Sequence, residues 1–368
     1  MDSRPAEAAR DPEPAPPEPG HAAPAVDTGR REGSTAWAAW EQAALRLVSR
    51  FDGLARQGRF HYQQPTALQA ATPRRLRRPY AVPVHYTDWG PRAAPVLLCC
   101  GGVANTAARF SFLAADLQRA GLRVVCMDWL GRGRSGWLAD DHEYNAATYL
   151  EQLRQCIAHL GIGPVSLLGS SMGGSVALAL AAKYPTLVQR LVLNDVGPHM
   201  ARARRLRRSQ TLARWYVFQT PADIMRRVGA AQKNDGPVAD DVRHFLAWHM
   251  TRWSEADAGR VYRHDPRALL AYRQAALQPL QQWEAWHQVR CPLLVLHGME
   301  SDALSSTTLA RMQRTRPITV AHVPRTGHTP VLNDRHQTAL VADWLCGAWP
   351  AGGELSVPLA PARRPART

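Results

Sequence analysis

The chain has 368 residues, 45 % of them hydrophobic, which is enough to build one large α/β domain with an insertion. Its formal net charge of +15 comes almost entirely from arginine, since Lys183 and Lys233 are the only lysines. The sequence has no recognition helix, zinc finger or aromatic single-strand-binding pattern, so we expect no nucleic-acid partner. No apolar run approaches the length of a membrane span and residues 1–20 are acidic and proline-rich, which predicts a cytoplasmic protein without a membrane span.

The amino-terminal part of the chain divides into two segments. Residues 1–33 are rich in proline, alanine and glutamate and are expected to be disordered. A helical extension is predicted over residues 34–79, because apolar residues recur there at helical spacing after a possible cap at Ser34 or Thr35. These apolar residues are Trp37, Trp40, Ala44, Leu47, Val48 and Phe51. We expect this helix to pack on its own domain.

From residue 80 onward, short apolar runs alternate with helical patterns. Strands are predicted at residues 82–86, 95–100, 122–127, 165–168, 190–194, 292–297 and 318–323, and helices at 112–120, 149–160, 176–182, around 309 and at 334–346. Continuous apolar runs are typical of strands buried on both faces. The alternation predicts an α/β fold with a doubly wound, mostly parallel sheet, formed by residues 80–198 and 288–349.

Between these two parts of the core, residues 199–287 change to a pattern rich in tryptophan and arginine, which predicts a helical cap without strands. The cap is expected to cover the site, with a minority of its aromatic side chains lining a pocket. These aromatic residues are Trp215, Tyr216, Phe218, Phe245, Trp248, Trp253, Trp283 and Trp286. Residues 350–368 form a proline-rich basic tail that we expect to be disordered.

A strand, a sharp turn and a helix follow one another around Ser171. The turn reads Gly169-Ser170-Ser171-Met172-Gly173, which is the G-x-S-x-G pattern of a nucleophile elbow. Glycines two places on either side of the serine relieve crowding where the strand reverses into the helix. We therefore interpret Ser171 as a nucleophile at the carboxyl edge of the sheet.

A serine needs a histidine to accept its proton and an acid to orient that histidine. Asp302 follows the strand at 292–297, and His328 follows the strand at 318–323. The order serine, acid, histidine fits a nucleophile, an orienting acid and a base in loops after strands. Asp195, after the strand at 190–194, is the alternative acid, and Asp302 is the preferred one.

These motifs carry a resemblance to a known family. From about Tyr80 to Trp349 the chain resembles the α/β-hydrolase superfamily, particularly its capped esterase, lactonase and carbon–carbon hydrolase branches. The elbow, the Asp128-to-Ser135 run that resembles a D-x-x-G-x-G-x-S loop, and Gly327-His328 carry the resemblance. The family usually has His-Gly where this chain has Gly101-Gly102.

The resemblance implies acyl transfer to water. His328 would take the proton of Ser171, Asp302 would support the imidazolium, and the backbone N–H groups of Val103 and Met172 would hold the oxyanion. The expected substrate is a small molecule, a medium-sized and partly apolar ester or lactone. The sequence indicates neither a metal nor an organic cofactor.

Two other functions stay open. One is hydrolysis of a carbon–carbon bond in a vinylogous diketone, and the other is a non-catalytic receptor or scaffold. The sequence does not reveal the natural substrate or the oligomeric state. The six cysteines have no metal-ligand spacing and are expected to be free and mostly buried.

Overall fold

The computed structural model describes residues 35–69, 73–74, 77–212, 216–232, 236–347 and 352–358. The predicted disorder of residues 1–33 and of most of the carboxyl-terminal tail lies outside these ranges. Within them, no helix is both long enough and apolar enough to cross a membrane.

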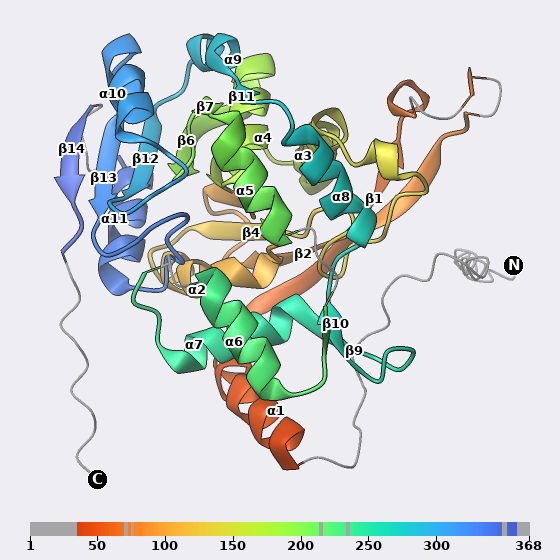
Figure 1. The fold of residues 1–368 in the computed structure, drawn as a ribbon. Helices are drawn as coiled ribbons and strands as arrows, with labels where there is room; N and C mark the ends of the chain where they lie inside the picture. The colour runs from red at the N-terminus through yellow and green to blue at the C-terminus, as the bar shows by residue number, and fades with distance from the viewer. Residues whose placement is uncertain are drawn as a thin grey trace, which may run out of the picture.

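A twisted sheet runs through the middle of the molecule (Figure 1). In the described part of the chain it has nine strands in the order β1-β2-β4-β3-β5-β6-β12-β13-β14. Only the β1–β2 and β2–β4 pairs are antiparallel, which confirms the doubly wound, mostly parallel sheet. The strands are β1 (Ala55–Gln64), β2 (Tyr80–Trp89), β3 (Val96–Cys100), β4 (Arg123–Met127), β5 (Val165–Ser170), β6 (Val188–Asn194), β12 (Leu293–Gly298), β13 (Thr319–Val323) and β14 (Gly353–Ser356).

Helices cover both faces of this sheet because its central strands bury alternate side chains on opposite sides. In β3, Leu98 and Cys100 join the core on one face, whereas Leu97 and Cys99 join the core on the other. The first core contains residues of α3, α4, α9 and α10, and the second contains residues of α2 and α11. These helices are α2 (Ser111–Arg119), α3 (Ala146–Leu160), α4 (Met172–Lys183), α9 (Trp283–Gln288), α10 (Ser306–Thr315) and α11 (Arg335–Leu345).

The segment between β6 and β12 lies beside the carboxyl edge of the sheet and is not purely helical. It contains α5 (Arg202–Leu212), α6 (Pro221–Gln232), α7 (Asp240–Met250) and α8 (Pro266–Ala275). The prediction of a segment without strands is wrong, because β8 (Val217–Phe218), β10 (Gly259–Tyr262) and β9 (Thr251–Ser254) form a small antiparallel sheet. Two further short strands, β7 (His199–Met200) and β11 (Leu280–Gln281), pair where the segment leaves and re-enters the core.

The predicted amino-terminal helix is present as α1 (Thr35–Val48), and it packs against the β6–β12 segment. Trp40 and Leu47 are buried against α6 and α7. The guanidinium of Arg260, itself fully buried, lies 5.1 Å from the Trp40 ring and 4.4 Å from the Trp248 ring. Figure 1 shows α1 at the foot of the molecule with α6 and α7 above it.

Two expectations at the ends of the sheet are wrong. Residues 55–64 form the edge strand β1 and not part of a helical extension, and residues 353–356 form the opposite edge strand β14 in the segment predicted to be a disordered tail. Short 3-10 turns complete the described elements: η1 (Ser49–Phe51), η2 (Thr66–Leu68), η4 (Ala107–Phe110), η5 (Asp141–Glu143) and η6 (Pro185–Leu187). The cysteines are all free, five of them buried and Cys346 exposed.

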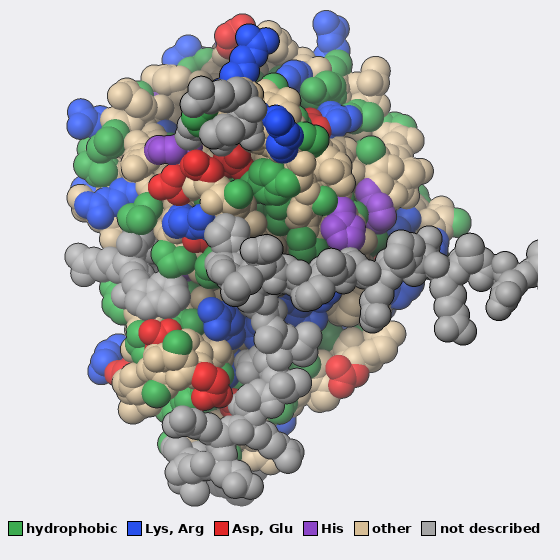
Figure 2. Space-filling view, turned by 90° about the vertical axis from the view of Figure 1, so that its right-hand side faces the viewer, with side chains coloured by type: hydrophobic (Ala, Val, Ile, Leu, Met, Phe, Trp, Pro, Cys, Tyr) green, Lys and Arg blue, Asp and Glu red, His purple; other side chains and the backbone are tan. Residues whose placement is uncertain are grey.

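The basic side chains do not form one continuous patch on the face drawn in Figure 2. There, Lys and Arg side chains lie in separate groups, with Asp and Glu side chains among them. The excess positive charge is therefore spread over this face.

Candidate active site

Ser171 lies at the turn between β5 and α4. Its backbone has φ 51° and ψ −118°, a conformation that a residue with a side chain rarely adopts. The N–H of Met172 belongs to the first residue of α4, so it has no acceptor within that helix. The serine thus projects from a strained turn beside free backbone donors.

Two glycines make this turn possible by letting backbones approach closely. A Cβ on Gly169 would come within 2.4 Å of the Cα of Gly174, and one on Gly173 would come within 2.3 Å of the carbonyl oxygen of Cys100. Both distances are far shorter than contact distance, and the obstructing atoms belong to backbone. The G-x-S-x-G spacing is therefore required by the packing of the elbow against β3 and against itself.

A buried acid faces the predicted base. Nδ1 of His328 lies 2.8 Å from Oδ2 of Asp195, and because a carboxylate can only accept, the ring nitrogen donates. Asp195 is fully buried and accepts two more hydrogen bonds, from Gly298 N at 3.1 Å and from Ser301 Oγ at 2.6 Å. These donors satisfy the carboxylate in its ionised form.

The structure corrects the preferred acid. Asp302 does not contact His328; its side chain is 56 % exposed and forms an ion pair with Arg208 of α5. The physical reason is the length of the loop after β12, which carries Ser301 to the acid site and turns Asp302 outward. Asp195 comes directly after β6, so the alternative acid occupies the position beside the histidine.

Asn194 links the serine strand to the histidine loop. Its Nδ2 donates to Ser170 Oγ at 2.8 Å and to the carbonyl oxygen of Pro330 at 3.0 Å. Nε2 of His328 is buried and has no hydrogen-bond partner among the described residues. With Nδ1 engaged by Asp195, that nitrogen carries the lone pair that can accept a proton.

The loop after β3 passes beside Ser171. A Cβ on Gly102 would lie 3.5 Å from the Cβ of Ser171, and Gly102 N donates to Asn105 Oδ1 at 3.1 Å. The carbonyl oxygen of Val103 accepts a hydrogen bond from Arg132 Nε at 2.9 Å. The loop is therefore fixed on both sides of the N–H of Val103 by side chains that the sequence reasoning did not single out.

The Asp128 loop braces this region. Asp128 accepts hydrogen bonds from His85 Nδ1 at 2.8 Å, Ala107 N at 2.7 Å and Arg134 N at 3.0 Å. Burial opposes ionisation of this carboxyl group, but the hydrogen bonds outweigh burial and lower its pKa. The D-x-x-G-x-G-x-S run thus ties β2, β4 and the loop after β3 together.

A cavity of about 150 Å³ lies over Ser171. Its aromatic lining comes from Tyr144, Tyr149 and Tyr272, and none of the aromatic residues singled out between 199 and 287 borders it. Trp286 is fully buried in the core, Phe245 and Trp248 border a different cavity, and Trp215 lies outside the described residues. The expectation that a minority of these aromatic residues line the pocket is wrong for the described ones.

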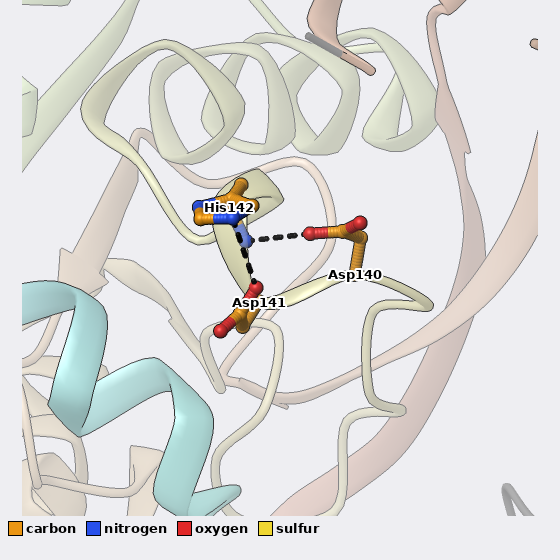
Figure 3. Close-up of side chains that lie close together, drawn as sticks. All are labelled: Asp140, Asp141 and His142. Carbon is orange, nitrogen blue, oxygen red and sulfur yellow. Dashed lines mark hydrogen bonds and ion pairs between the residues drawn. The ribbon is translucent and has the colours of Figure 1, made fainter. Parts of the chain in front are cut away.

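Asp140, Asp141 and His142 lie together on a partly exposed turn (Figure 3). Oδ1 of Asp140 accepts the backbone N–H of His142 at 2.8 Å, and His142 Nε2 lies 3.7 Å from Asp141 Oδ1. Asp140 is thus the cap of η5, which accounts for its orientation.

The comparisons with known proteins agree with this geometry. Residues 94–334 match the sequence profile of a family described as alpha/beta hydrolase fold. The chain belongs to the α/β-hydrolase family. A solved α/β hydrolase from Novosphingobium aromaticivorans has 25 % sequence identity and a TM-score of 0.68, over 80 % of this chain and 99 % of that one. The resemblance inferred from the motifs is confirmed, and the chain is a hydrolase of this family.

Two curated α/β-hydrolase relatives are similar over much of this chain. A 3-hydroxybutyrate-oligomer hydrolase from Cupriavidus necator is 31 % identical over 72 % of this chain and 92 % of its own length. An (E)-2-((N-methylformamido)methylene)succinate hydrolase from Acinetobacter baylyi is 29 % identical over 60 % of this chain and 75 % of its own length. Both relatives are named as hydrolases.

Proposed function

We propose that this α/β hydrolase cleaves a carboxylic ester or lactone through an acyl-enzyme intermediate on Ser171. The observation that carries the proposal is the fully buried Asp195 hydrogen-bonded to His328, in a loop that Asn194 connects to the serine strand. The similarity to a 3-hydroxybutyrate-oligomer hydrolase supports an ester of a small hydroxy acid as the substrate.

The proposed reaction has two halves. Nε2 of His328 takes the proton of Ser171 as the serine oxygen attacks the carbonyl carbon, and the N–H groups of Val103 and Met172 hold the oxyanion. The intermediate collapses, and the alcohol leaves with the proton from His328. Water then attacks the acyl-serine with His328 again as base, releasing the acid and restoring Ser171.

Asp195 has a positioning role in this mechanism. Its carboxylate holds the imidazole with Nδ1 protonated and stabilises the imidazolium that forms during each attack. Gly298 and Ser301 orient the carboxylate in turn. The strained backbone of Ser171 keeps its hydroxyl clear of the helix, where a bound carbonyl can reach it.

The test compares wild type with Ser171→Ala on p-nitrophenyl esters of increasing chain length. We expect wild-type hydrolysis and a loss on the order of 10⁶ in kcat for the variant, because nucleophile and base act as one unit. A serine-reactive phosphonate should label wild type and not the variant. Equal hydrolysis by both proteins would refute the nucleophile. Turnover of a dienoate vinylogous diketone, with the esters untouched, would instead indicate carbon–carbon cleavage.

A further inference from the structure

The cavity over Ser171 carries positive charge without negative charge. Arg132 borders it from the core and Arg205 from α5, and no Asp or Glu is among the described residues that line it. Small side chains form much of the remaining surface: Ala146, Ala179, Ala268, Ala271 and Ala275. A short apolar chain ending in an anion would fit this distribution.

Arg132 is a buried cation that lacks an ion pair in the described structure. It is 1 % exposed, and it donates to the carbonyl oxygens of Val103 at 2.9 Å and Leu130 at 2.8 Å, and to the hydroxyl of Tyr149. Its Nη2 is buried without a hydrogen-bond partner in the part of the chain that is described. Buried charges are normally paired, so this nitrogen is available to hydrogen-bond an anionic group.

Aromatic rings compensate Arg132 only in part. Its guanidinium carbon lies 5.1 Å from the ring centre of Tyr149 and 5.9 Å from that of Tyr144. Such contacts attract a cation through the ring quadrupole but add no negative charge. The acid near these rings, Asp265, is occupied by Arg267 at 2.7 Å and by the Tyr144 hydroxyl at 2.7 Å.

Arg205, which borders the cavity from α5, also contacts a carbonyl oxygen and an aromatic ring. It donates to the carbonyl oxygen of Gln278 at 3.0 Å and lies 5.9 Å from the ring centre of Tyr272. Among the described residues no carboxylate pairs with it. Arg208, one turn along the same helix, is paired with Asp302, so α5 presents one neutralised arginine outside the cavity and one without an acid partner at the cavity.

We propose that the substrate of this site carries a free carboxylate, and that Arg132 and Arg205 supply its counter-charge. The inference rests on the proposed ester hydrolysis and adds the substrate class: a short ester whose non-reacting end is a carboxylic acid. A cavity of about 150 Å³ suits such a short acid. The carboxylate completes the ion pair that buried Arg132 lacks, and Arg205 draws the anion into the cavity.

The kinetic experiment uses two substrates that differ only in charge: mono-p-nitrophenyl adipate and its methyl ester. Wild type is expected to prefer the free acid in kcat/KM by about tenfold to a hundredfold, the range typical of a charged hydrogen bond. Arg205→Gln should remove most of this preference, because it should lower kcat/KM for the free acid far more than for the methyl ester. Arg208→Gln, the matched control on α5, should leave both substrates unchanged.

Arg132 also donates a hydrogen bond to the Val103 carbonyl. An experiment on Arg132 must therefore separate its effect on the position of this loop from its effect on binding of the carboxylate. Arg132→Lys keeps the charge, and Arg132→Met removes it. If Arg132 only positions the loop, both variants lower kcat for the acid and the methyl ester by the same factor. If it binds the carboxylate, Arg132→Met raises KM for the acid selectively, and Arg132→Lys restores part of the preference.

Binding without turnover decides the proposal independently of catalysis. Calorimetric titration of Ser171→Ala with monomethyl adipate should give tighter binding than dimethyl adipate, and Arg205→Gln in the same background should remove most of the difference. Equal binding of the two probes would overturn the carboxylate site even if ester hydrolysis is intact. A charge preference in binding, with no hydrolysis of either ester by wild type, would uphold the site and refute the ester reaction.

Discussion

Oδ2 of Asp195 lies 2.8 Å from Nδ1 of His328, across 133 positions of sequence. The contact depends on three neighbouring strands. β6 delivers the acid, the last residue of β12 and the loop after it supply Gly298 N and Ser301 Oγ to its oxygens, and the loop after β13 brings the histidine. A Cβ on Gly298 would come within 2.0 Å of the carbonyl oxygen of Gly327, so these loops are closely packed. The orientation of His328 therefore depends on how these three strands and the loops that follow them pack at the carboxyl edge of the sheet.

The first prediction separates the two candidate acids. Asp195→Asn keeps the shape of the side chain but removes the charge, and it can present an N–H toward Nδ1, favouring the wrong tautomer of His328. We expect kcat to fall by up to about 10⁴. Asp302→Asn removes only an exposed ion pair and should leave kcat within about twofold.

The measurement is the steady-state hydrolysis of a p-nitrophenyl ester, with circular dichroism to check that both variants are folded. The opposite ranking, with Asp302→Asn inactive and Asp195→Asn near wild type, would contradict the geometry of the site. A loss in neither variant would mean that the histidine needs no acid.

The sequence alone predicts Ser171 as nucleophile and His328 as base, but it could not choose between the acids. Ser171 has a local signature, since glycines at fixed positions are required by the elbow, and His328 follows a buried strand. Asp195 and Asp302 each follow a strand too. Which carboxylate faces the histidine depends on the course of the loop after β12 in space. Arg132 was part of a recognised motif, but its lack of an ion pair is visible only in three dimensions.

The fold was predictable where strands are buried on both faces. β3 is a continuous apolar run and β4, β5 and β12 are mostly apolar, whereas the edge strands are not. β1 has a period-two burial pattern, with Phe60, Tyr62 and Gln64 buried and the polar residues His61 and Gln63 exposed between them. β14 is mostly exposed and pairs only with β13. Edge strands of this kind are stabilised by their partner more than by their own composition.

The second prediction concerns the loop that carries the N–H of Val103. Asn105→Ala removes the acceptor that holds Gly102 N at 3.1 Å. We expect kcat to fall by roughly tenfold to a hundredfold with KM nearly unchanged, because an oxyanion donor acts mainly in the transition state. Steady-state kinetics on a saturating ester series measures both constants. A rise in KM with unchanged kcat would show that the loop contributes to ground-state binding instead.

The third prediction concerns the attachment of α1. Trp40 is buried and lies beside both Trp248 and the guanidinium of Arg260. Trp40→Ala should lower the free energy of unfolding by about 3 to 5 kcal/mol, as for other buried aromatic residues. Leu45, on the same helix, is 46 % exposed, and Leu45→Ala should change that free energy by no more than about 0.5 kcal/mol. Urea denaturation measures both, and similar values for the two variants would mean that α1 is not docked.

The last prediction is a pH dependence of stability that arises at His264. This histidine is 5 % exposed and stacks on Tyr262 with ring centres 5.0 Å apart. Burial, and then the charge of Arg132, lower its pKa to about 3. Below about pH 6.5, the ordinary pKa of histidine, the unfolded chain binds a proton at His264 that the folded protein does not bind. The free energy of unfolding therefore falls as the pH drops from about 6.5 toward 3.

His264→Phe keeps a stacking ring and removes this titration. Relative to wild type, its free energy of unfolding should rise by about 1.4 kcal/mol for each pH unit below 6, and the difference should be constant above pH 7. Urea unfolding at pH 7.5, 5.5 and 4.5 measures the difference in the free energy of unfolding between the two proteins. Both proteins contain the same carboxylates, so the effect of protonating them cancels in this difference. His142→Phe, at a side chain that is 63 % exposed, controls for loss of a histidine as such. A constant difference between His264→Phe and wild type at all three pH values would mean that His264 takes up its proton in the folded protein as readily as in the unfolded chain, and that Arg132 does not repel it.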